Sequence, residues 1–296
     1  MPYFCTTMDK HLKILVSLCL TLFLYSCEKE IEIELDETLP KLVVDGSIEN
    51  GRPPLIVLNK SLEYFGTLSS DALLQSFVRK ADVTISTNGQ IFKLIEDSVK
   101  VDRNFLYYYT QPLLIGKLNT RYTLTIKTGS QTFTAETTIP SITRSIDSLW
   151  WEKVTIEKDS SYARLKMKTT DKPGFGDYIR YFTQQNKDQF FPGLNSVFDD
   201  QIIDGRTYTI AVDKGVNKNL PFEEANLYFK RGDTATLKLC NIDKATYDFW
   251  RTFEFNFQSI GNPFSSPIKV LGNISGNALG YFGGYAAQYR TLIIPK

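Results

Sequence analysis

Strand-like runs of apolar and β-branched residues recur along the first half of the chain, and those at 122–127 and 133–139 alternate apolar and polar residues with a period of two. Runs with this strand character lie at 41–48, 55–58, 81–86, 91–95, 122–127 and 133–139. Such alternation predicts strands with one face in the core and one in solvent. Asn88 and Gly89 separate two of the runs, and this dipeptide is typical of a two-residue hairpin turn. The pattern predicts an immunoglobulin-like or transthyretin-like β-sandwich over 37–142.

The second half, 145–296, continues the alternation but contains one helical pattern. Strand-like runs lie at 162–169, 178–182, 206–212, 235–240, 268–274 and 280–294. Aromatic residues recur from Phe249 to Phe257 with a period near 3.6, and Asp243 stands where a helix N-cap is expected. We therefore predict a second antiparallel β domain with one packed helix near 243–258. A barrel and a sandwich fit this pattern equally well.

The N-terminus carries an apolar run of another kind, which follows Lys13 and ends at Cys27. The run is too short to cross a bilayer comfortably and has the length of the apolar region of a secretory signal. A small residue followed by cysteine is typical of a bacterial lipoprotein signal. Residues 1–26 are therefore predicted to be a signal peptide, Cys27 the lipidated residue, and 27–36 an acidic tether.

The charge balance excludes one class of partner. The chain has 34 basic and 33 acidic residues, and the two lysines and one aspartate of the leader leave the remainder neutral. Proteins that bind nucleic acid usually carry a basic stripe or a high pI. We therefore expect no nucleic-acid partner.

Histidine and cysteine are scarce enough to exclude several mechanisms. The single histidine, His11, lies in the leader, so the mature chain can build neither a histidine-dependent triad nor a typical catalytic zinc site. Only Cys240 follows Cys27, which leaves no pair for an internal disulfide, and Cys240 is predicted to be a buried small hydrophobe. No cofactor, no metal and no catalytic residue is predicted.

Aromatic clusters supply the candidate ligand-binding residues. They lie at 107–109, 150–151 and 190–191, and the candidates taken from them are Trp150, Trp151 and Tyr108. Exposed rings of this kind can stack against the apolar faces of sugars. Because neighbours along a strand point to opposite faces, one tryptophan of the pair is expected in the core and the other in solvent.

Carboxylates are scattered over the second half. They are Asp171, Asp177, Asp199, Asp200, Asp204, Glu223 and Glu224. Asp199, Asp200 and Asp204 share a polar stretch, but they lack the ligand spacing and the final glutamate of a calcium loop. We interpret this stretch as a solvated turn. A catalytic pair would require two acids to converge at roughly 5–9 Å, which spacing along the chain does not show.

Three features together resemble a known family. They are the lipoprotein signal ending at Cys27, the opening 42–54 (LVVDGSIENGRPP), and a C-terminal series of elements at 262–267 (NPFSSP), 272–276 (GNISG) and 280–285 (GYFGGY). In this combination the chain resembles the domain-of-unknown-function 4249 lipoproteins of Bacteroidota. The resemblance implies an envelope lipoprotein of a kind often encoded beside TonB-dependent outer-membrane transporters. The glycines of 280–285 are expected to permit a tight bend or a close approach of strands.

These observations lead to one expected function and two alternatives. We expect an outer-membrane lipoprotein, anchored through Cys27 and facing either outside or the periplasm, that is a non-enzymatic binding or accessory component beside a TonB-dependent transporter. Its ligand is expected to be a glycan or a peptide. The alternatives are a carboxylate-dependent glycan-processing enzyme and a structural or adhesive envelope component.

Overall fold

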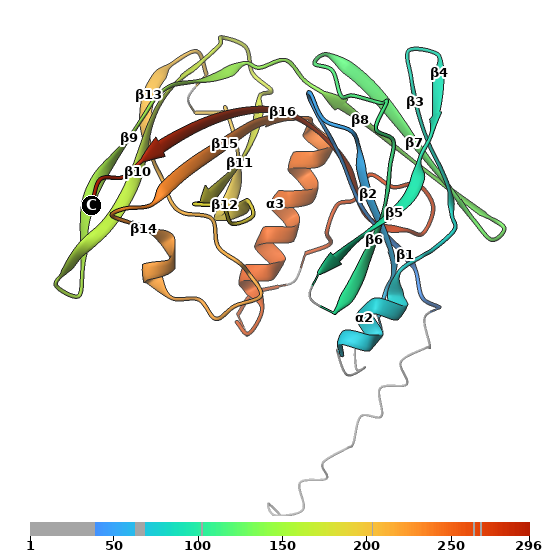
Figure 1. Ribbon diagram of the computed structural model, residues 1–296. Coiled ribbons are helices and arrows are strands. Elements are labelled where there is room, and N and C mark those ends of the chain that lie inside the picture. The colour runs from blue at the N-terminus through green and yellow to red at the C-terminus, as the bar shows by residue number, and fades with distance from the viewer. Residues whose placement is uncertain (1–38, 63–68, 102, 203, 263, 267) are drawn as a thin grey trace, which may run out of the picture. The chain divides into compact units, whose positions relative to one another are not determined.

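A computed structural model describes residues 39–62, 69–101, 103–202, 204–262, 264–266 and 268–296 (Figure 1). The predicted signal peptide, the tether and Cys27 lie outside the described residues. Residues 40–296 form one compact unit. Among the described residues, no helix has both the length and the apolar character needed to cross a membrane.

An eight-stranded sheet organises the molecule. In spatial order its strands are β12 (Phe191–Asp199), β11 (Tyr178–Gln185), β15 (Thr234–Ile242), β16 (Leu279–Ile293), β1 (Leu42–Glu49), β2 (Leu55–Lys60), β6 (Asn104–Thr110) and β5 (Ile95–Val101). β16, dark red in Figure 1, pairs with β15 on one side and with β1 on the other. The predicted segments 37–142 and 145–296 therefore share one sheet and are not separate compact units.

The pairing of β1 with β16 also differs from the antiparallel arrangement expected throughout. These two strands run parallel, with Val43 opposite Leu279 and Glu49 opposite Tyr285. Parallel partners need a long connection, and here nearly the whole described chain supplies it. A pattern read locally along either strand does not reveal its direction relative to the other.

Two smaller sheets complete the β structure. One contains β4 (Gln90–Lys93), β3 (Asp82–Thr87), β7 (Thr120–Thr128) and β8 (Gln131–Ile139). In the other, β10 (Asp159–Asp171) pairs with β9 (Arg144–Ile156) and also with β13 (Thr207–Val212) and β14 (Phe229–Lys230). All three sheets are open, so the described strands form no closed barrel and the sandwich alternative fits the second segment.

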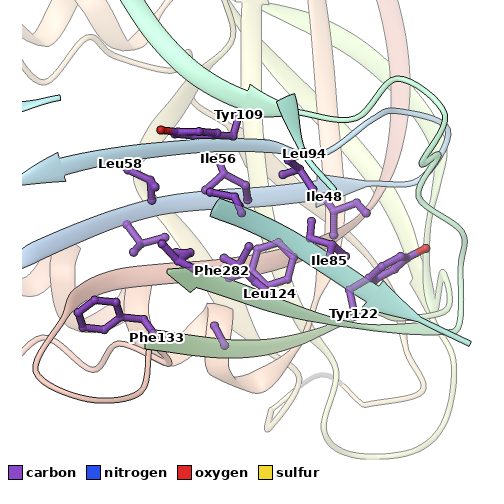
Figure 2. Packing of buried hydrophobic residues seen from close by; sticks show 14 of the residues in the cluster. Ile48, Ile56, Leu58, Ile85, Leu94, Tyr109, Tyr122, Leu124, Phe133 and Phe282 are labelled. Carbon is purple, nitrogen blue, oxygen red and sulfur yellow. The ribbon is translucent and has the colours of Figure 1, made fainter. Parts of the chain in front are cut away.

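Both small sheets pack on the same face of the large one. Leu239 of β15 packs in the same hydrophobic core as residues of β10, and Ala286 of β16 packs in the same core as residues of β7. The register places Asn241, two residues after Leu239, opposite Ala286, so these side chains share a face. The alternation predicted for β7 and β8 is confirmed, because Tyr122, Leu124 and Phe133 lie in the first core (Figure 2).

Local turn and cap signals are confirmed. Asn88 and Gly89 have φ values of 48° and 74° and form the two-residue turn between β3 and β4, as the type I′ geometry requires. A short helix, α2 (Ser70–Ser76), begins after the N-cap Ser69, and a 3-10 turn, η1, spans Glu224–Leu227.

The predicted long helix is present as α3 (Lys244–Ser259) and covers the opposite face of the large sheet. Its residues Tyr247 and Phe249 pack with Cys240 and Tyr281. The N-cap Asp243 accepts from the Thr246 backbone N–H at 2.9 Å and from the Thr137 hydroxyl of β8 at 2.6 Å. One carboxylate thus caps the helix and ties it to β8.

The strand predicted at 268–274 is absent from the described part of that segment, and this prediction is wrong. Only Ile274 makes an isolated bridge, to Ala135. Side chains take the backbone hydrogen bonds instead: Asn256 accepts from Ile268 N, and Asn273 both accepts from and donates to the Phe282 backbone. An anchored loop therefore replaces the expected strand.

Candidate functional site

A pocket of about 390 Å³ lies among β11, β12, the segment 214–222 and the C-terminal half of α3. This volume is in the range of small-molecule sites, roughly 300–1,000 Å³. Its apolar wall consists of Phe191, Leu194, Val216, Leu220, Phe222 and Phe257. Leu220 and Phe222 are 63% and 59% exposed, which leaves apolar surface available to a ligand.

The segment that carries the two lysines of the pocket crosses β11 and β12 closely. The Gly215 N–H donates to the Thr183 hydroxyl at 2.7 Å, and the Val216 N–H donates to the Pro192 carbonyl at 3.1 Å. A Cβ at Gly215 would lie 2.0 Å from the Phe191 carbonyl oxygen, so only glycine fits this crossing. The crossing places Lys214 and Lys218 in the wall of the pocket.

Both lysines are poorly hydrated. Lys214 Nζ donates to Gln185 Oε1 at 3.2 Å, and Lys218 Nζ lies 3.4 Å from Glu254 Oε1. Burial lowers the pKa of Lys214, and burial also lowers the pKa of Lys218 although Glu254 acts in the opposite direction. Because a desolvated ammonium group is stabilised by a negative partner, the two lysines favour an anionic group on a ligand.

A buried polar network lies behind Lys218, between the large sheet and α3. Glu254 accepts from the Ser196 N–H at 2.9 Å and from its hydroxyl at 2.5 Å. Arg180 donates to the same hydroxyl at 3.2 Å and to the Tyr285 hydroxyl at 3.1 Å, and its guanidinium lies 3.4 Å from the centre of the Trp250 ring. Glu254 therefore interacts with two cations: with Lys218 directly, and with Arg180 through the Ser196 hydroxyl.

The negative charges near the two lysines come from three carboxylates, those of Glu254, Asp188 and Asp233. Asp188 is the carboxylate among the residues that line the pocket, and it is exposed at the rim. Glu254 pairs with Lys218, and the charges of Asp233 and Asp188 act to raise the pKa of Lys214 against the effect of burial.

A group of three carboxylates corrects one sequence prediction. Asp171, Asp177 and Asp200 each place an oxygen within 4.8 Å of the others. Asp171 and Asp200 are each only 1% exposed, so the interpretation of the stretch containing Asp200 as a solvated turn is wrong for this residue. Asp200 accepts from the Gly176 and Asp177 N–H groups, both at 3.0 Å, and thereby closes the loop before β11.

Among the described residues, these three carboxylates form the group that could hold a cation. However, Arg144 already supplies a positive charge to Asp171, with its Nη2 and Nε 2.9 and 3.1 Å from Oδ1. Burial raises the pKa of Asp177, and repulsion from Asp171 and Asp200 adds to this shift. A protonated Asp177 would relieve that repulsion, so the arrangement is explained without a metal, and we assign none.

The structure does not bring the predicted ligand-binding residues together. Trp151 packs against the second core and Trp150 lies half-buried on the other face of β9, as strand alternation requires. Tyr108 lies on β6 of the large sheet and donates to Asp97 at 3.1 Å. None of the three lines the pocket. Of the aromatic clusters noted in the sequence, only 190–191 contributes to it.

Sequence reasoning missed the two lysines and Phe257. A lysine in a polar connecting segment has no local signal that distinguishes a buried ammonium from a solvated one. The prediction for Cys240 is confirmed: it is a free and fully buried thiol, and burial raises its pKa to about 12, so it is chemically inert at neutral pH.

Solved structures of pullulanases show a weak likeness to this chain. Pullulanase from Anoxybacillus sp. LM18-11, complexed with maltotriose, is 9% identical with a TM-score of 0.21 over 66% of this chain. Type I pullulanase from Bacillus subtilis str. 168, complexed with maltose, is 6% identical with a TM-score of 0.20 over 70% of it. The matched regions span 24% of each pullulanase chain, and likenesses at this level carry no argument.

No curated protein matches the sequence. The model of one family, described as a domain of unknown function (DUF4249), matches residues 28–291, from the residue after the predicted lipidation site almost to the end of β16. The resemblance noted in the sequence is thereby confirmed, and the chain belongs to the DUF4249 family.

Proposed function

We propose that this protein is a non-enzymatic binding lipoprotein of the outer membrane that captures ligands joining an apolar body to a carboxylate. The observation that carries the proposal is the pair of desolvated lysines, Lys214 and Lys218, in a pocket walled by phenylalanines and leucines. The apolar wall contacts the body of the ligand, and the lysines pair with its carboxylate. Among the expected ligand classes, this favours a hydrophobic peptide with a free C-terminus over a neutral glycan.

The ligand proposal predicts a preference that calorimetry can measure. We expect the detergent-solubilised full chain to bind trileucine at least tenfold more tightly than trileucine amide, since hydrogen bonds to charged groups contribute about 1.5–3 kcal/mol. Replacing both lysines (Lys214→Met and Lys218→Met) should remove the preference. It should also weaken as the pH rises toward the lowered lysine pKa values, because the ammonium groups then lose their charge.

The matched control for this experiment is Lys153→Met, which removes an exposed lysine of β9 outside the pocket. This variant should bind as the unmodified protein does. Equal affinities for trileucine and its amide, or tight binding of the neutral trisaccharide raffinose that survives both lysine substitutions, would contradict the proposed ligand chemistry.

The anchor is a separate part of the proposal and rests on Cys27. Replacing it (Cys27→Ser) removes the thiol that would carry the lipid, so we expect the protein to move from the membrane pellet to the soluble fraction after ultracentrifugation. Loss of palmitate labelling should accompany this release. Retention of the variant in the membrane with its label intact would show that Cys27 is not the site.

The proposed partner is a TonB-dependent transporter, which rests on the context implied by the resemblance noted in the sequence. We expect affinity purification of the tagged protein from native membranes under mild detergent to recover such a transporter. The Cys27→Ser variant serves as the control, since it lacks the proposed anchor. Repeated purification of intact membrane complexes without any transporter would count against the accessory role.

A further inference from the structure

A second cavity lies inside the second sandwich, between β10 and β13 of the small sheet and β11, β12 and β15 of the large one. Its volume is about 320 Å³. The apolar lining consists of Met167, Phe198, Ile210, Val212, Leu237 and Leu239. Asn195 and Ala211, which also line this space, are exposed, so the cavity opens to solvent and a ligand can enter it.

Two polar atoms at this cavity lack hydrogen-bond partners within the described part of the chain. The hydroxyl of Tyr208 and Oδ1 of Asp213 are both buried, and both residues line the cavity. Asp213 Oδ1 lies 3.3 Å from Arg164 Nε, but neither atom meets its partner at hydrogen-bonding geometry. Arg164 still supplies Asp213 with an opposite charge, and native structures contain few buried polar atoms without partners, so the Tyr208 hydroxyl is the atom that points to a missing partner.

The chemistry of these atoms restricts what the partner can be. Burial raises the pKa of Tyr208, so its hydroxyl stays protonated and can donate. Asp213 offers an acceptor, and no lysine or arginine is among the residues that line the cavity. An anionic ligand would meet the Asp213 carboxylate and an apolar wall, which disfavours it, whereas an uncharged hydroxyl can donate to one group or accept from the other.

We propose that this cavity is a binding site for a neutral, mainly apolar molecule about the size of two fused rings that carries one hydroxyl group. The apolar wall contacts the rings, and the Tyr208 hydroxyl orients the hydroxyl of the ligand. This site differs in ligand chemistry from the lysine-lined pocket, and it does not depend on the function proposed for that pocket.

The proposal can be tested with 2-naphthol and naphthalene as paired probes, followed by probe fluorescence on the full chain at pH 7. We expect one 2-naphthol to bind per chain, at least tenfold more tightly than naphthalene. Tyr208→Phe should reduce this preference severalfold without lowering the unfolding midpoint, because it removes an unpartnered hydroxyl and little volume. Ile210→Trp should abolish binding of both probes by filling the cavity.

Thr209→Trp is the matched control, since Thr209 is the exposed neighbour of Ile210 on β13 and does not line the cavity. It should bind both probes as the unmodified protein does, as should the double variant Lys214→Met and Lys218→Met. Equal affinity for the two probes would overturn the proposal, as would an unchanged preference in Tyr208→Phe. The Tyr208→Phe result decides the matter even if Ile210→Trp does not fold.

Discussion

Replacing Asp171 with asparagine is expected to lower the free energy of unfolding by about 3–5 kcal/mol, since this removes the carboxylate to which a fully buried guanidinium donates two hydrogen bonds. The side chains of Arg144 and Asp171 are both 0% exposed. Asp171 also accepts from the Gly205 N–H at 3.2 Å, so its loss affects the loop before β13 as well. Urea unfolding followed by tryptophan fluorescence measures the change.

The position of Arg144 explains why this pair has such a large expected effect. Arg144 begins β9, directly after the connection from the first sandwich to the second, and its carbonyl oxygen accepts from the Gln288 side chain of β16. Its Nη1 already lacks a hydrogen-bond partner in the described structure. Asp171 is thus the carboxylate that compensates this cation, and an asparagine keeps the shape but not the charge.

The matched control is the exposed pair of Arg121 and Glu136, whose side chains are 69% and 50% exposed. Glu136→Gln should change the free energy of unfolding by no more than about 1 kcal/mol, as is usual for surface ion pairs. Replacing both buried partners (Arg144→Met with Asp171→Leu) should recover most of the stability lost in Asp171→Asn. If Asp171→Asn and Glu136→Gln have equal effects, the buried pair does not stabilise the fold as argued.

Replacing Gly284 with alanine is the second large effect, expected to destabilise the protein by about 3 kcal/mol. A Cβ at this position would lie 2.4 Å from the Thr138 carbonyl oxygen and 2.8 Å from the Ile139 nitrogen. Both are backbone atoms of β8, which cannot rotate away as a side chain would. The substitution should therefore separate β16 from β8, and thermal and urea unfolding measure the loss.

Gly51→Ala provides the contrast. Gly51 has a φ of 77° and no atom within 4 Å of a Cβ, so alanine there meets conformational strain but no contact. A cost of about 1–2 kcal/mol is expected. A smaller effect at Gly284 than at Gly51 would show that the strands move apart easily, and that close approach is not what requires glycine in 280–285.

Gly280 supports the same explanation for the glycine-rich stretch. It has a φ of 97°, and a Cβ there would lie 1.9 Å from the Val44 carbonyl oxygen of β1. The expectation that these glycines permit close approach of strands is therefore confirmed. Residues 280–285 therefore have a structural role where β16, the last described strand, pairs with β1, the first.

Much of the local structure could be predicted because its signals lie within a few residues. The Asn88 and Gly89 turn, the alternation in β7 and β8, and the Asp243 cap of α3 each depend on neighbours along the chain. The prediction of a strand at 268–274 is wrong because what holds this segment is not a local signal. Its backbone is held by Asn256 and by Asn273, whose amides imitate strand partners, and no apolar pattern reports such bonds.

The sequence by itself determined the β-rich class and the long helix α3, because periodicity and caps act locally. Tertiary structure decided which residues meet. The parallel pairing of β1 with β16, the burial of Asp171 beside Arg144, and the desolvation of Lys214 and Lys218 all join residues distant in the chain. A side chain's charge state and partners depend on what surrounds it in space, and the same aspartate or lysine is equally compatible with a solvated turn.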